Sequence, residues 1–246
     1  MILFSILLIL IVTLAAGAYP FVKKIRSAKK LDFPIGESLA SGVFLGAGLI
    51  HMLGDSAQGF IDAHVDYPFA FLIAGVSFLF LLLLEHIGRE MYEHNGAQSS
   101  AFAVLTLVML SVHSFLAGAA LGFSSSFSVF LVILLAILAH KWAASFALAV
   151  QLNKSQLRIK TSIMLFIVFA LMVPLGILFG DAVMHRLHNM PLLQPIFSAL
   201  AAGTFLYLGT LHGLKRAVMV EKCCNLNRFK YVMIGFTIMA VVAIWT

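Results

Sequence analysis

The chain has 246 residues, of which 62% are hydrophobic and 11% are charged, and its formal net charge is +6. Soluble domains carry about 25% charged residues, so this composition excludes a soluble globular protein and indicates an integral membrane protein. The basic residues cluster at the ends of apolar segments, which indicates membrane topology rather than nucleic-acid binding.

Apolar runs of about 20 residues, the length that crosses the hydrocarbon core as a helix, follow one another along the whole chain. Open strands cannot satisfy their backbone hydrogen bonds in lipid, so every run is predicted to be helical. The sequence therefore predicts an all-α integral membrane protein with eight transmembrane helices in a single polytopic domain, residues 1–246. The predicted spans are 1–22, 35–54, 68–88, 101–123, 127–150, 161–183, 196–214 and 231–246.

The segments between these runs differ in charge. The first, KKIRSAKK, holds five basic residues, and the other odd-numbered segments are also basic, whereas the even-numbered ones together hold only Arg186. Basic segments stay on the cytoplasmic side, which places both termini outside the cytoplasm. The first run lacks a basic start and precedes a basic cluster, so it is predicted to be a retained anchor rather than a cleaved signal peptide.

The second connecting segment is expected on the outer face and contains no lysine or arginine. It carries Asp55, Asp62, His64 and Asp66. An acidic outer surface attracts cations, although ordinary solvated loop residues would give the same pattern.

Four histidines fall at different depths within the predicted spans. His51 lies toward the outside, His113 and His140 near mid-membrane, and His212 toward the cytoplasm. Ionisable groups at such depths are costly and usually line a cavity or a transport route. Neutral imidazole is a common ligand for zinc, copper, iron and nickel. The alternative is that each ring hydrogen-bonds to a neighbouring helix and only stabilises packing.

Lys141 follows His140 directly and also lies in mid-membrane. A lysine there cannot reach the interface as one near a helix end does, so it must be neutral, paired or hydrated. Small residues around these positions, including Gly118 and Ala143, allow the fourth and fifth spans to approach closely.

Several of these segments resemble signatures of the ZIP (Zrt/Irt-like) family of divalent metal transporters. HSFLAG at 113–118 is similar to the family's His-Ser-x-x-Glu-Gly and is followed by ALG at 120–122. His140-Lys141 resembles the start of the fifth-span motif, His-x-x-x-Glu. PLG at 174–176 and AAGTFLY at 201–207 resemble the sixth- and seventh-span signatures. The resemblance covers spans 2 to 7 and implies a ZIP-like bundle.

The chain departs from the family pattern at three positions. Ala117 and Ala144 stand where the family usually has glutamates one turn after the histidine, and His212 stands at the usual acidic position of the seventh span. Because residues i and i+4 share a helix face, His113 must find its partners on other helices, chiefly His140, with Ser114 as a further candidate. Without carboxylates at positions 117 and 144, the charge of a divalent cation is less well neutralised. A protonated Lys141 would add further positive charge near it.

The resemblance implies transport of a divalent metal ion toward the cytoplasm, with zinc favoured and Cu(I) as a softer alternative. No enzymatic activity and no permanently bound cofactor are expected. The expected partners are the lipid bilayer and the metal ion, with a homodimer left open and no nucleic acid. The expected location is the cell membrane, or the inner membrane in a Gram-negative bacterium. The predicted metal-binding residues are His113, His140, Ser114, His51, His212 and Asp55.

Two alternatives remain at this point. A protein that has lost both carboxylates could keep the fold and act as a metal sensor or a membrane scaffold without transport. Intramembrane histidines can also ligate haem, but the staggered depths of the four histidines disfavour a haem protein.

Overall fold

The computed structural model describes residues 1–26, 33–93, 98–124, 126–186, 190–211 and 226–244, and the regular structure within these ranges is helical. This confirms the predicted all-α membrane fold. The helices are α1 (Ile2–Arg26), α2 (Pro34–Gly46), the π-helix η1 (Ala47–Met52), α3 (Leu53–Asp62), α4 (Phe69–Glu93), α5 (Gln98–Gly122), α6 (Phe127–Lys154), α7 (Ile159–Arg186), α8 (Leu193–Tyr207) and α9 (Leu226–Val242).

Six helical segments in the described ranges are long and apolar enough to cross a membrane. One of them is the continuous segment Pro34–Asp62, which joins α2, η1 and α3. α8 and α9 are shorter, with 15 and 17 residues, and residues 208–211 extend α8 by a π-helical turn.

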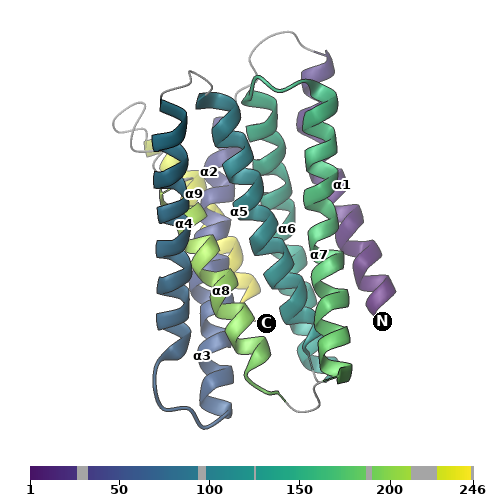
Figure 1. Ribbon diagram of the computed structural model, residues 1–246, viewed down its shortest axis with the longest axis vertical. Helices are drawn as coiled ribbons and strands as arrows, with labels where there is room; N and C mark the ends of the chain where they lie inside the picture. Colours follow the sequence, from purple (N-terminus) through teal and green to yellow (C-terminus); the bar gives the residue numbers. More distant parts are fainter. Residues whose placement is uncertain (27–32, 94–97, 125, 187–189, 212–225, 245–246) are drawn as a thin grey trace.

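The helices differ in how much of their surface faces outward. Within the spans, 22% of Ile2–Lys23 and 28% of Phe69–Gly88 are buried, against 61% of both Pro34–Asp62 and Ala103–Gly122. Large exposed hydrophobic side chains such as Leu3 and Phe71 cover the outer faces of α1 and α4. α4 and α1 accordingly flank the bundle while α5 and α6 lie between them (Figure 1), so the polar groups of α5 and α6 are shielded from lipid.

The second predicted span, 35–54, is too short. The helix continues to Asp62, so Asp55 and Asp62 lie in α3 rather than in a loop. Its last turns are held by α8, since the Ser56 hydroxyl donates a hydrogen bond to the Pro195 carbonyl oxygen at 2.7 Å and Phe60 is buried. This packing stabilises a helical end that its polar sequence alone does not indicate.

Four glycines let the backbones of α5 and α7 touch. Gly118 and Gly122 of α5 face Gly176 and Gly180 of α7. A Cβ atom added at Gly118 would overlap the carbonyl oxygen of Val173, and one at Gly180 would overlap that of Ala119. Small residues commonly permit such close approach between membrane helices.

We expect Gly180→Ala to destabilise the protein by about 1–3 kcal/mol, the usual cost of overpacking. The added methyl group meets backbone atoms of α5, which cannot move aside as a flexible side chain could. A lower midpoint of thermal unfolding in detergent, followed by circular dichroism, would confirm this.

Gly75→Ala is the matched control, because a Cβ atom there has no neighbour within 4 Å. Alanine favours a helix over glycine by about 1 kcal/mol, so this variant should unfold at the wild-type temperature or above. Equal midpoints for the two variants would contradict the tight α5–α7 contact.

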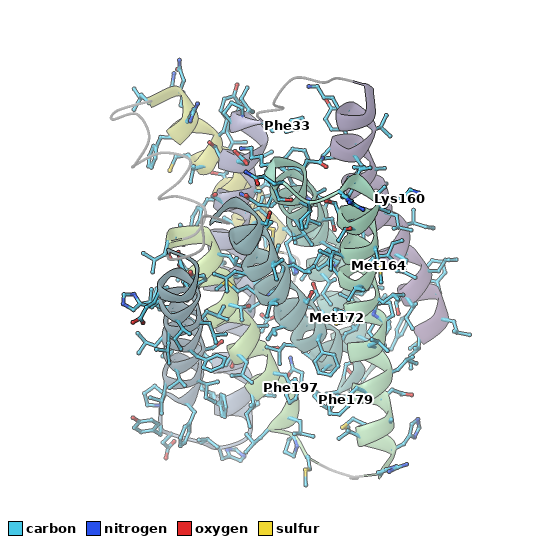
Figure 2. The ribbon with its side chains drawn as sticks, turned by 45° about the horizontal axis from the view of Figure 1, so that its top comes forward. Phe33, Lys160, Met164, Met172, Phe179 and Phe197 are labelled. Carbon is cyan, nitrogen blue, oxygen red and sulfur yellow. The ribbon has the colours of Figure 1, made fainter. Side chains whose placement is uncertain are left out.

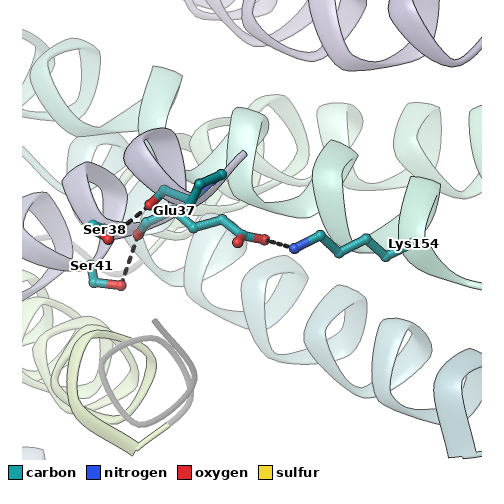
Figure 3. Close-up of polar contacts among 5 residues, drawn as sticks. Glu37, Ser38, Ser41 and Lys154 are labelled. Carbon is teal, nitrogen blue, oxygen red and sulfur yellow. Dashed lines mark hydrogen bonds and ion pairs between the residues drawn. The ribbon is translucent and has the colours of Figure 1, made fainter. Parts of the chain in front are cut away.

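One end of the bundle carries an ion pair between α2 and α6 (Figure 3). Lys154 Nζ lies 2.7 Å from Glu37 Oε1, and the backbone carbonyl of Glu37 accepts a hydrogen bond from the Ser41 hydroxyl at 2.9 Å. The side chains of Lys154 and Glu37 are 34% and 20% exposed, and such pairs contribute at most about 1 kcal/mol. The ion pair therefore links α2 and α6 but contributes little to the stability of the fold.

An aromatic cluster covers the other end of the bundle, where α5 and α7 end and α8 begins. Figure 2 shows Phe179 of α7 beside Phe197 of α8, with ring centroids 6.4 Å apart. Phe123 contacts both rings, at 6.3 Å and 4.9 Å between centroids. These aromatic contacts stabilise the helix ends at this side of the bundle.

Candidate functional site

Two predicted site residues meet in the centre of the bundle. His113 of α5 and His140 of α6 are 2% and 1% exposed. Their ring centroids are 5.8 Å apart with an angle of 70° between the planes. Two helices thus bring one imidazole each to the same buried place.

α8 holds the His113 ring from two sides. His113 Nδ1 lies 2.7 Å from Thr204 Oγ1 and 3.2 Å from the Ala201 carbonyl oxygen. The face of the ring stacks on Phe205, at 3.5 Å between centroids and 16° between planes. Phe205 also meets the His140 ring edge-on at 4.9 Å, so this phenyl ring forms one wall of the site.

Each central imidazole has a buried nitrogen without an aligned hydrogen bond. His113 Nε2 and His140 Nδ1 make none with the residues that the structure describes, although His140 interacts with the Ala136 carbonyl group one turn earlier. A buried polar atom left unpaired costs about 1–3 kcal/mol, and in native proteins it often marks a bound water or ion. These two nitrogens are therefore candidate ligand atoms for a metal ion.

A second pair of predicted residues lies one turn apart where η1 meets α3. His51 Nδ1 is 2.9 Å from Asp55 Oδ2, although the contact is not aligned as a hydrogen bond. His51 is 5% exposed, whereas the Asp55 side chain is 30% exposed. The carboxylate can therefore meet solvent while the imidazole faces the interior.

A small cavity lies beside the His51–Asp55 pair. Its volume is about 20 Å³, enough for one water molecule. His51 and Asp55 line it together with Ala117, one turn after His113, and Ile137, almost one turn before His140, whereas the two central histidines themselves do not line it. Ala117 thus leaves open space where a longer side chain would project.

Ser114 is placed differently from the central histidines. Lys141 Nζ donates a hydrogen bond to Ser114 Oγ at 2.9 Å and lies 4.0 Å from the centroid of the Phe169 ring of α7. The buried amino group of Lys141 therefore contacts a hydroxyl and an aromatic face. The role of Ser114 as a metal ligand stays a prediction, and a metal ion there would compete with Lys141.

The site is poor in ligands compared with typical protein metal centres. In the part of the chain that the structure describes, no three His, Cys, Asp or Glu side chains gather closely enough to hold a metal ion. Ala117 and Ala144 are buried at 5% and 1% exposure and supply no ligand atom. His212 lies outside the described residues, so its predicted role at the cytoplasmic end stays a prediction.

Sequence reasoning missed three features of the site. Thr204 and Phe205 entered only as part of the AAGTFLY signature, and their residue types alone did not indicate that they contact His113, which is distant in the sequence. The π-helix η1, which carries His51, was also missed, because π-turns interrupt helical periodicity over one turn only. Such turns are frequent at functional sites.

Comparison with known proteins identifies relatives along almost the whole chain. The family model described as ZIP Zinc transporter matches residues 1–101 and 93–243. Zinc transporter ZIP2 of Mus musculus is 27% identical, over 84% of this chain and 83% of the relative. Zinc transporter ZIP2 of Homo sapiens is 26% identical over 96% and 95%, and zinc transporter ZIP1 of Danio rerio is 33% identical over 64% and 52%.

Proposed function

Because the chain belongs to the ZIP zinc transporter family, we propose that it carries divalent metal ions, with zinc favoured, across a membrane toward the cytoplasm. The observation that supports a central site is the pair of buried ring nitrogens, His113 Nε2 and His140 Nδ1, that make no aligned hydrogen bond within the described ranges. Imidazole nitrogen is a preferred ligand of zinc, and two of them meet where lipid is excluded.

The proposed route begins at Asp55 and His51. The partly exposed carboxylate of Asp55 collects a cation at the outer face, and His51 offers an imidazole behind it. The ion then crosses the cavity beside Ala117 and reaches His113 and His140. The inward direction is favoured by the family resemblance and by the acidic residues of the segment expected on the outer face, which attract cations there.

A site with few ligand atoms binds a metal ion weakly, which suits a transport route better than a storage site. A divalent ion held by two neutral imidazoles, without carboxylates at positions 117 and 144, keeps its full charge in a poorly solvated place. Such binding is loose, and conduction requires an ion to leave as readily as it enters. Ions that favour nitrogen ligands, such as zinc, tolerate this site better than magnesium does.

Zinc uptake by the purified protein in liposomes tests this function. A zinc-sensitive dye inside the liposomes should report saturable uptake that empty liposomes lack. Cadmium should compete, whereas magnesium, which prefers oxygen ligands, should not. Magnesium competing as well as cadmium would contradict the imidazole site.

The second candidate function is a sensor or scaffold that keeps the fold without transport. It is favoured by the two alanines at positions 117 and 144. Correctly inserted protein that moves no first-row divalent ion, but still binds zinc, would identify a sensor. Protein that neither moves nor binds zinc would identify a scaffold.

A further inference from the structure

Thr204 stands in a chain of two short hydrogen bonds that ends on His113. Its hydroxyl oxygen lies 2.6 Å from the Ala201 carbonyl oxygen and 2.7 Å from His113 Nδ1. A threonine hydroxyl carries a single proton, so it can donate to only one of these two neighbours.

The chemistry of the Ala201 carbonyl group determines where the Thr204 hydroxyl proton points. The Ala201 oxygen can only accept, so a 2.6 Å contact with the hydroxyl requires the threonine to donate there. Thr204 Oγ1 must then accept from His113 Nδ1, which must carry a hydrogen. His113 Nδ1 also lies 3.2 Å from the same carbonyl oxygen. This contact again requires a hydrogen on Nδ1, because a bare nitrogen lone pair would face a lone pair of the oxygen.

The remaining nitrogen follows from this assignment. A neutral imidazole carries one ring hydrogen, so Nε2 of His113 presents a bare lone pair. That atom is buried and has no hydrogen-bond partner among the residues that the structure describes. The Phe205 ring, stacked at 3.5 Å on the imidazole, prevents the ring from turning about its long axis.

We propose that Thr204 is a positioning residue that fixes His113 as the tautomer protonated at Nδ1 and aims the bare Nε2 into the site as its metal-ligating atom. Outer partners of this kind commonly orient histidine ligands and raise their basicity. The ligand role of Nε2 rests on the proposed function, but the tautomer does not.

Nitrogen NMR of histidine-labelled protein in micelles tests the tautomer without any metal. The His113 signals, assigned by their loss in His113→Asn, should show a protonated Nδ1 and an unprotonated Nε2. In Thr204→Val, which keeps the shape but removes the hydroxyl, Nδ1 keeps only its longer contact with the Ala201 carbonyl oxygen, so the share of the Nδ1-protonated tautomer should fall below that of the wild type. A protonated Nε2 in the wild-type protein would overturn the proposal.

Zinc uptake tests the consequence of that tautomer. Thr204→Val should raise the zinc concentration for half-maximal uptake by roughly 10–100-fold, the usual effect of losing such an outer partner, and Thr204→Ser should restore most of it. Thr210→Val is the matched control. It removes a hydroxyl that donates to the Leu206 carbonyl oxygen in the same region, and it should behave as wild type.

The outcomes separate the two claims. Wild-type uptake in Thr204→Val, or equal losses in Thr204→Val and Thr204→Ser, would overturn the positioning role. The expected NMR signals in a protein that moves no zinc would instead overturn the proposed transport and leave the tautomer standing.

Discussion

His113→Ala and His140→Ala are each expected to lower zinc uptake by at least about tenfold, since even residues that only orient a metal ligand are worth roughly 10–100-fold. Each change removes one of the two imidazoles that meet at 5.8 Å in the core, and no carboxylate at positions 117 and 144 can take its place. Initial rates of zinc uptake into liposomes, normalised to the inserted protein, measure the effect.

His86→Ala is the matched control for these variants. His86 lies on a membrane-spanning helix, α4, but its side chain is exposed, so its loss should leave uptake unchanged. Because alanine leaves a hole in a tightly packed core, His113→Gln and His140→Gln should be measured as well. Wild-type uptake in any of the four central variants would contradict the central site.

Ala117→Glu is expected to tighten zinc binding by about tenfold or more, because a carboxylate in a poorly solvated site attracts a cation strongly. Ala117 lines the cavity beside His51 and Asp55 and shares a helix face with His113. The zinc concentration for half-maximal uptake should fall. The maximal rate should fall too, because a tightly held ion leaves slowly.

Ala117→Gln separates the effect of charge from that of size. Glutamine fills nearly the same volume as glutamate but adds no negative charge, so its affinity should stay near that of the wild type. If the two variants bind zinc equally, the missing carboxylate is not the reason for a weak site.

The helical architecture could be predicted from the sequence because lipid leaves the backbone few alternatives. Apolar runs such as 127–150 agree with observed helices such as α6 to within a few residues. The helix ends were harder to predict. α3 continues to Asp62 because Ser56 bonds to Pro195, 139 positions away, and no local pattern contains that contact.

The candidate site could be predicted only in part, for the same reason. Depth along the chain placed His113 and His140 at one level, and the structure brings their rings together. The partners of His113 come from α8, and those of Lys141 come from α5 and α7. A single sequence shows which residue types are present but not which helices face one another.

The interleaved glycines of α5 and α7 have a mechanical consequence. At Gly118 and Gly180 the backbones of α5 and α7 are in direct contact, and an axial shift of one helix past the other would break this fit. We therefore expect α7 to move together with His113 in any conformational change that opens the protein to one side of the membrane.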